Sequence, residues 1–496
     1  MTTAGPRRWL AFGAIMLGVL TIGFDTTILN VALPTLSTAI NASTSQLQWL
    51  MDAYVLVFAG LILPMGVLGD RYGRKRLLLI GLGLFTVASV GAVLTTSPTT
   101  LIWVRGLMGI GAAILTPVAV AVLPVLFSPE ERGRAVAMSM MVMGIGMPLG
   151  PILGGYLLRH YWWGSIFLIN VPVALVALVA VAYLLPESRD PHPQRPDLPG
   201  GLLSTLGLVA FVYGVIEAPA RGWSSGPVLG GVLVGLLLLG AFIAWERHTT
   251  SPMIDLRLFG RPRFLWGTAA GTIITFTMLG LLFVLPQYLQ AVRNNDAMGS
   301  GVRLLPMMAG IIIGAKAGER LATRLATRVP VAAGMVVVAV GLGLGSLTSV
   351  DSGYGLVAFW LLLFGVGAGA ALTPAMDAVL GELPVERAGA GMALTMTLRQ
   401  VGGALGVAML GSLSAAAYVD RLDQRIDLSR LPGPAEQAAR DSVSGAVAVA
   451  HRLGDSALLT GAQASYLHAM AVVLVVCAAV AVLGAVLTAA LLSGGP

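Results

Sequence analysis

Three charged residues stand inside long apolar stretches of this sequence. Asp25 lies in GFDTTILNVALP, Asp52 in QLQWLMDAYVL and Arg105 in LIWVRGLMGIGAA. An ionisable side chain in such surroundings needs a partner or a water-filled cavity, and it often marks the path of an ion or a substrate. The two carboxyls can bind a proton or a cation, and Arg105 can bind a carboxylate. For Arg105 the alternative is a side chain that extends to the membrane surface.

Patterns typical of catalytic, nucleotide and metal sites are missing from the sequence. The glycine-rich basic run at 66–76 lacks the G-x-x-x-x-G-K-[ST] spacing of a phosphate loop. No H-E-x-x-H pattern occurs, and the five histidines are scattered through loops or near predicted helix ends. The lone Cys477 permits neither a disulfide nor a cysteine metal site within one chain. We therefore expect no enzyme activity, no metal, no cofactor and no use of ATP.

The composition indicates an integral membrane protein. Hydrophobic residues make up 56% of the 496 positions and charged residues 11%, whereas soluble domains have roughly 25% charged residues. This excludes a water-soluble fold. The net charge of +7 comes from short basic clusters between apolar stretches, which membrane topology explains better than nucleic-acid binding does.

The apolar stretches predict an all-α protein with about fourteen transmembrane helices, each of about 20 residues. The first stretch is too long for a signal-peptide core of about 7–15 residues, so we expect it to be a retained helix. The predicted spans are 9–33, 47–68, 77–96, 101–124, 134–157, 165–185, 202–218, 227–245, 264–288, 299–319, 330–349, 354–379, 391–417 and 465–492.

Basic residues distinguish the two sides of the predicted membrane. Alternate loops, starting with the N-terminus, contain most of them, whereas the short loops of the other side contribute only Arg159, Arg221, Arg293 and Arg303. The positive-inside rule therefore favours cytoplasmic positions for both termini. The polar segment 418–464 is an outer loop with several arginines, but loops of this length cross the membrane largely regardless of charge. We expect it to form a small extracellular hairpin.

The chain contains an internal repeat. GIGAAILTP at 109–117 resembles GAGAALTP at 367–374, and PEERGRA at 129–135 resembles PVERAGA at 384–390. Each pair joins the end of a helix to the next cytoplasmic loop in the same orientation, as parallel six-helix repeats require. The predicted domains are a six-helix bundle at 1–185, a linker with two inserted helices at 186–263, and a second bundle at 264–496.

Two further motifs are rich in glycine. GVLGDRYGRKR (66–76) has glycines for a tight turn and places Asp70 and several cations at the cytoplasmic surface. It can equally be a loop that obeys the positive-inside rule. GIGMPLGPILGG (144–155) lets neighbouring helices touch backbone to backbone and leaves a bend. Packing alone is a sufficient explanation of that motif.

Together these motifs resemble the major facilitator superfamily, specifically its 14-helix drug:proton antiporter class, over nearly the whole chain. With WWGSIFLINVP at 162–172, the carboxyls look most like those of QacA- and LfrA-type multidrug efflux pumps for lipophilic organic cations. The resemblance implies two parallel six-helix bundles plus a two-helix insertion. It also implies three groups of site residues: Asp25, Asp52 and Arg105 for substrate and protons; Gly66, Asp70, Arg71, Gly73 and Arg74 for a cytoplasmic gate; and Gly146, Gly150, Pro151, Gly154 and Gly155 for the antiporter motif.

Three other polar residues in the apolar stretches are candidates. QacA-like pumps can carry an acid just after LLPM, whereas this chain reads LLPMMAGIIIGAK and ends that run at Lys316. A lysine repels divalent cations, so we expect no strong preference for them, although Lys316 can also extend to the cytoplasmic face. Glu217 lies near an outer helix end, where anchoring at the interface is the alternative. Arg399 lies farther inside and can pair across the bundle or face water.

The expected function is proton-coupled export of lipophilic organic cations by a monomer in a bacterial inner membrane. Nearly all basic residues are arginine, with lysine only at Lys75 and Lys316, which suggests a high-GC bacterial genome. The alternative is export of an endogenous antibiotic, a lipid or a neutral amphipathic metabolite on the same fold. A receptor or scaffold without transport is a remote third, because the repeat and the membrane carboxyls favour a transporter.

Overall fold

Every regular element in the described part of the chain is a helix. The computed structural model describes residues 6–189, 197–249, 252, 256–383 and 388–492. Within these residues, thirteen helices are long and apolar enough to cross a membrane. The helix α6 (Pro129–His160) covers the predicted span at 134–157 as well. The prediction of an all-α, multi-pass membrane protein with about fourteen spans is therefore confirmed.

The chain divides into two compact units, each assembled from several segments. Unit 1 comprises Met1–Ala32, Trp49–Phe211 and Leu233–Ile254. Unit 2 comprises Leu33–Gln48, Val212–Val232 and Asp255–Pro496. The inserted helices α9 (Leu198–Arg221) and α10 (Gly226–His248) are thus shared between the units.

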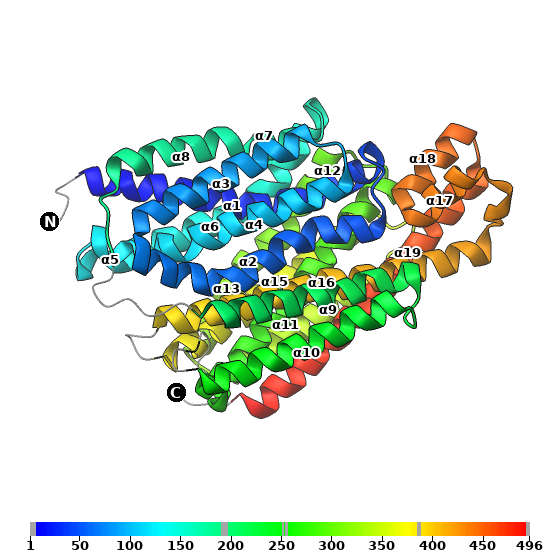
Figure 1. Cartoon of the computed structure of the whole chain (residues 1–496). Helices are drawn as coiled ribbons and strands as arrows, with labels where there is room; N and C mark the ends of the chain where they lie inside the picture. The colour runs from blue at the N-terminus through cyan, green and yellow to red at the C-terminus, as the bar shows by residue number, and fades with distance from the viewer. Residues whose placement is uncertain (1–5, 190–196, 250–251, 253–255, 384–387, 493–496) are drawn as a thin grey trace. The chain divides into compact units, whose positions relative to one another are not determined.

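Unit 1 contains the first predicted bundle. In Figure 1, α3, α4 and α8 run side by side, and α3 packs against both of the others. Glycine allows a closer approach of α4 to α2, because a Cβ added at Gly109 would lie 2.6 Å from the carbonyl oxygen of Tyr54. The helices are α1 (Pro6–Ala39), α2 (Thr44–Tyr72), α3 (Arg74–Leu94), α4 (Pro98–Ala121), α5 (Leu123–Leu126), α6, α7 (Ser165–Leu168) and α8 (Asn170–Leu184), of which the end of α1 and the start of α2 belong to unit 2.

Unit 2 contains the second predicted bundle. Here α15 packs against α11, α13 and α14, while α16 packs against α11 and α19. The helices are η1 (Leu256–Gly260), α11 (Pro262–Gln287), η2 (Tyr288–Val292), α12 (Ala297–Arg303), α13 (Leu305–Ala322), α14 (Arg328–Ser346), α15 (Tyr354–Gly381), α16 (Ala388–Arg425), η4 (Leu428–Arg430), α17 (Gly433–Asp441), α18 (Val443–Leu453) and α19 (Ser456–Leu491).

The ends of the helices follow from local chemistry. Proline stands at or next to the first position of α4, α6 and α11, where its missing N–H costs nothing. The turn between α2 and α3 is made at Gly73, whose φ of 115° strongly favours glycine. The segment 418–464 contains the end of α16, the short helices η4, α17 and α18, and the start of α19; α18 packs against α17 and α19 (Figure 1). Ser442 caps α18 by accepting a hydrogen bond from the Gly445 N–H.

Many large apolar side chains point outward from the helices. Trp103 is 74% exposed and Leu237 72% exposed. Only 17% of the apolar window of α10 is buried within the protein. Such surfaces would be unstable in water at this extent, and they suit a bilayer, whose lipid tails are as apolar as these side chains.

Candidate functional site

A buried polar centre lies in unit 1 between α1, α4 and α8. The Nη1 atom of Arg105 is 2.6 Å from Oδ2 of Asp25, and both residues are almost completely buried. The Asn170 side-chain amide donates a hydrogen bond of 3.0 Å to the other carboxylate oxygen of Asp25. Both oxygens of Asp25 therefore have donors, and its charge is balanced within the bundle.

The same centre orients Arg105 through α2. Its Nε atom donates to the Leu50 carbonyl at 3.1 Å. Its guanidinium lies 4.4 Å from the ring centroid of Tyr54, where a cation–π contact is favourable. The Arg105 side chain thus points into the helix bundle and does not extend to the membrane surface. The sequence gives no charge signal for Asn170, because it is a neutral amide at the start of an apolar helix.

Asp52 occupies a different environment from Asp25. Its side chain is fully buried, and neither carboxyl oxygen has a hydrogen-bond partner among the described residues. The Tyr54 ring marks the side of α2 that faces Arg105. Because a helix turns about 100° per residue, Asp52 points to the opposite side of α2. Of the two predicted acids, Asp25 is paired with Arg105, whereas Asp52 has no partner among the described residues.

The predicted cytoplasmic gate lies at the turn between α2 and α3. The Glu187 carboxylate accepts a hydrogen bond from the Lys75 N–H at 3.1 Å. A Cβ added at Gly73 would lie 2.7 Å from an oxygen of the same carboxylate. Arg71 is exposed and stacks on the Tyr72 ring at 5.6 Å. The turn therefore needs glycine for its φ and for the close carboxylate.

The other gate residues are described less completely. A Cβ added at Gly66 would lie 3.3 Å from Pro117 of α4, so α2 and α4 are close at this position. The backbone N–H of Arg74 donates to the Ser188 carbonyl at 2.9 Å. The side chain of Asp70 lies outside the described residues.

The predicted antiporter motif packs α6 closely against α1. A Cβ added at Gly150 would lie 2.7 Å from the Phe24 carbonyl oxygen, and one added at Gly154 would lie 2.6 Å from Ile28. Phe24 and Ile28 flank Asp25 on α1, so the motif fixes the backbone that carries this acid. Pro151 and Gly155 are buried in the same helix, whereas for Gly146 only the helical backbone is described.

The remaining predicted residues, Glu217, Lys316 and Arg399, belong to unit 2. Glu217 forms an ion pair of 2.8 Å with Arg221 one turn along α9, and the Arg221 side chain is half exposed. This arrangement suits an interface anchor. Lys316 is exposed beside the exposed Ile312 and Ile313. Arg399 is partly buried, and its Nε atom donates to the Thr275 hydroxyl at 3.2 Å.

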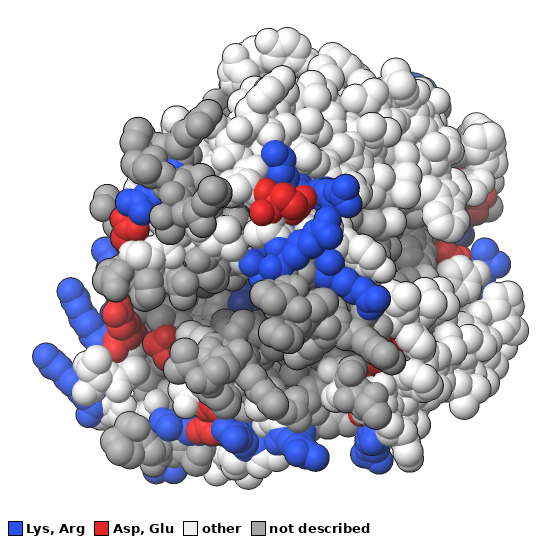
Figure 2. All heavy atoms as spheres, turned by 60° about the vertical axis from the view of Figure 1, so that its left-hand side comes forward, with Lys and Arg blue, Asp and Glu red and all other residues white. Residues whose placement is uncertain are grey.

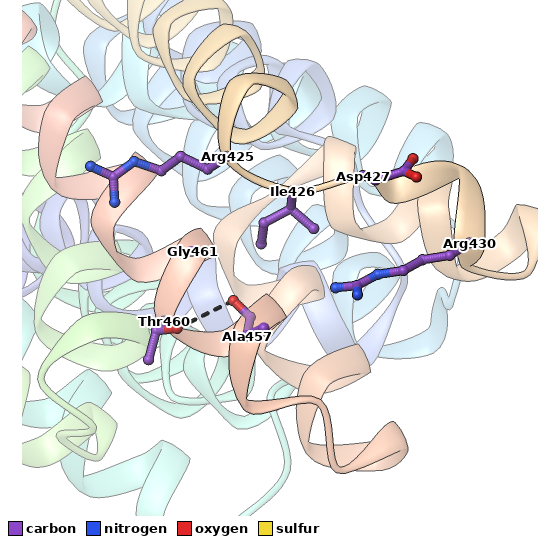
Figure 3. A pocket seen from close by; sticks show the side chains of 7 residues that line it. All are labelled: Arg425, Ile426, Asp427, Arg430, Ala457, Thr460 and Gly461. Atoms are coloured by element: carbon purple, nitrogen blue, oxygen red, sulfur yellow. Dashed lines mark hydrogen bonds between the residues drawn. The ribbon is translucent and has the colours of Figure 1, made fainter.

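A cavity of about 440 Å³ lies between the end of α16 and the start of α19, and Figure 3 shows the side chains around it. Arg430 at its wall pairs with Asp455 at 3.3 Å, and Thr460 donates to the Ala457 carbonyl. None of the predicted site residues lines this cavity. Its lining residues are Arg425, Ile426, Asp427, Arg430, Ala457, Thr460 and Gly461.

Charge on the surface gathers in patches. Figure 2 shows prominent Lys and Arg side chains, with fewer acidic ones, on the face it draws. In unit 1, Arg8 pairs with Glu131 at 2.8 Å. Among the described residues, no group of three or more His, Cys, Asp and Glu side chains could hold a metal ion.

Comparison with known proteins gives one family and many relatives. Residues 15–407 match the family model of the Major Facilitator Superfamily. The chain is 33% identical over 436 residues to the tetracenomycin C resistance and export protein of Streptomyces glaucescens, covering 87% of this chain and 81% of that protein. It is 33% identical to the methyl viologen resistance protein SmvA of Salmonella typhimurium, covering 92% and 91% of the two chains.

A third relative and a solved structure extend the comparison. The multidrug efflux pump LfrA of Mycolicibacterium smegmatis is 32% identical over 471 residues, which cover 94% of this chain and 92% of that protein. A bacterial homologue of the human lysosomal transporter Spinster, crystallised inward-facing and unoccupied, superposes with a TM-score of 0.69 at 18% identity. The alignment covers 100% of both chains. At this identity the likeness concerns the fold alone.

Proposed function

Because the chain belongs to the major facilitator superfamily, we propose that it is a proton-coupled multidrug efflux antiporter for lipophilic organic cations. The family and the relatives, which are drug-resistance and efflux proteins, indicate a transporter. One relative is named for methyl viologen, an organic cation, which supports a cationic substrate. Another is a tetracenomycin C resistance and export protein, so export of an endogenous antibiotic, a lipid or a neutral amphipathic metabolite on the same fold is the second candidate.

The observation that carries the proposal is the unpartnered Asp52. An ionised carboxylate that is fully buried and lacks donors loses hydration without replacement. Such a group is stable when it holds a proton or when a cation lies beside it. A proton and a cationic substrate therefore compete for Asp52, and this competition is the basis of antiport.

Asp25 and Arg105 have a different role in the proposed cycle. Their charges already balance each other, so Asp25 needs neither a proton nor a substrate to be stable in this conformation. We assign the pair to holding α1, α2 and α4 in register around the transport path. Protonation of Asp25 would break its ion pair with Arg105, so the pairing would depend on proton movement.

The proposed direction of transport follows from topology and energy supply. The substrate enters from the cytoplasm, the six-helix bundles rock, and protons from outside displace the substrate from Asp52. The membrane potential contributes about 2.3 kcal/mol per 100 mV for each net charge moved. We further propose that both termini lie in the bacterial cytoplasm and that one chain is sufficient for transport.

The experiment is ethidium accumulation in inverted membrane vesicles with an acidic interior. Wild-type protein should accumulate ethidium, and a protonophore should abolish the accumulation. Asp52→Asn should reduce gradient-driven accumulation at least about tenfold, because a neutral amide can neither exchange a proton nor attract the cation. Asp351→Asn, which changes an exposed loop acid, is the matched control. Full accumulation by folded Asp52→Asn would exclude the assigned role of Asp52.

A further inference from the structure

Arg399 is a charged side chain of unit 2 without an acidic partner among the described residues. Its Nε atom donates to the Thr275 hydroxyl at 3.2 Å, and no ion pair of the described residues includes it. The Thr275 hydroxyl itself donates to the Gly271 carbonyl at 2.8 Å, so its oxygen is free to accept from Arg399. The two Nη groups of Arg399 have no described hydrogen-bond partner.

The position of Arg399 is deep along the helices. Thr275 lies near the middle of α11 (Pro262–Gln287). Arg399 lies eleven positions after the first residue of α16 (Ala388–Arg425), which corresponds to about 16 Å at 1.5 Å per residue. A guanidinium at this depth cannot be explained as an anchor at a helix end. Substrate sites of secondary transporters lie near the midplane of the bilayer, which is the depth that these positions indicate for Arg399.

The stem of Arg399 is fixed by packing against α11. A Cβ added at Gly271 of α11 would lie 3.2 Å from Arg399 Cδ and 2.9 Å from Met376 Cε of α15. The stem therefore lies against α11 close to α15. The residue as a whole is only partly buried, unlike Arg105, which is 1% exposed. Arg399 is thus held in one direction, and no described acid neutralises its guanidinium.

We infer that Arg399, positioned by Thr275, binds an acidic oxygen of the transported molecule. A guanidinium offers two parallel donors that match a carboxylate or phenolate, and it keeps its charge at all physiological pH values. An Arg with only a packing role at this depth would need a compensating acid. The substrate class is therefore organic cations that also bear a carboxylate or a phenolate.

This inference rests on the proposed function, because it concerns the molecule that is exported. The test uses the purified full-length chain in lipid nanodiscs and two matched fluorescent probes, rhodamine B and its ethyl ester. The two differ in the carboxylate alone. Wild-type protein should bind the acid about tenfold more tightly than the ester, as a charge-assisted pair predicts.

Variants of Arg399 separate recognition from structure. Arg399→Gln should bring the affinities for acid and ester to within about twofold while leaving the ester affinity unchanged. Arg399→Lys should keep part of the preference, because it keeps the charge but loses the paired donors. Thr275→Val should lower the preference less than Arg399→Gln does, because it removes only the positioning hydroxyl.

Two results would overturn the inference. One is equal affinity of the wild type for acid and ester, a comparison that needs no variant and so holds even if Arg399→Gln does not fold. The other is an equal loss of both probes in Arg399→Gln, which would indicate a structural role. Proton-driven ethidium accumulation tests the proposed function separately, because ethidium has no acidic oxygen.

Discussion

The two membrane acids of unit 1 differ in what their loss would leave behind. Asp25→Asn would leave Arg105 buried with its charge unbalanced, at a cost of about 3–5 kcal/mol in the free energy of unfolding. Asp52→Asn removes a carboxyl without a described partner, so the stability should be equal or higher. Thermal denaturation of the two purified variants in one detergent measures the difference. A melting temperature of Asp25→Asn equal to that of the wild type would contradict the paired arrangement.

The sequence predicts the charged residues of the site but not their pairing. Asp25 and Arg105 each stand out by their charge within an apolar stretch. They are 80 residues apart in the chain, and Asp25 and Asn170 are 145 apart, so no local pattern joins them. The structure also shows which acid is balanced. Which acid is balanced depends on where α1, α4 and α8 meet, and neither residue spacing nor hydropathy predicts that meeting point.

At the scale of helices, glycine determines how closely neighbours approach. The α1–α6 contact in unit 1 has a counterpart in unit 2, where Gly402 and Gly406 of α16 face the backbone of α11 at Thr272 and Phe276. The two glycine runs stand in corresponding parts of the repeat. Both bundles therefore use the same close packing between their first and fifth helices.

Substitution of Gly150 tests this packing. Gly150→Ala would bring a methyl group into contact with the α1 backbone beside Asp25, and overpacking of this kind costs about 1–3 kcal/mol. We expect a lower melting temperature and weaker ethidium accumulation. Gly240→Ala in α10 is the matched control, because a Cβ there would meet nothing within 4 Å. An effect of equal size in both variants would mean that helix propensity, and not close packing, explains the loss.

The helices themselves were predictable because length and hydropathy are local properties. The expected spans coincide with the observed helices to within several residues. The largest differences concern α16, which continues to Arg425, and α19, which begins at Ser456. The apolar stretch of a span ends at the edge of the hydrocarbon layer. The helices continue beyond it because polar contacts stabilise them there, such as the hydrogen bond from the Tyr418 hydroxyl to the Ala439 carbonyl. Sequence patterns do not show such partners.

At the scale of the whole molecule, the repeat predicted two bundles, but the segment joining α1 to α2 could not be assigned from it. Residues 33–48 belong to unit 2. The Ser37 and Ser442 hydroxyls lie 2.8 Å apart and are both buried. The Gln48 amide donates to the Ala408 carbonyl at 2.9 Å and to the Ser412 hydroxyl at 3.2 Å. These hydrogen bonds hold residues 33–48 against α16 and against the start of α18.

Removing the Gln48 amide should loosen this connection. Gln48→Leu removes the hydrogen bonds of this amide to α16, which costs about 0.5–1.5 kcal/mol for each bond lost. In a Cys477→Ala background, a cysteine at Ser45 should then react faster with a membrane-impermeant maleimide, because the proposed topology places this segment outside. Gln424→Leu, which changes an exposed glutamine of α16, is the control. Unchanged labelling in Gln48→Leu, with an unchanged melting temperature, would show that these hydrogen bonds do not hold residues 33–48 against α16.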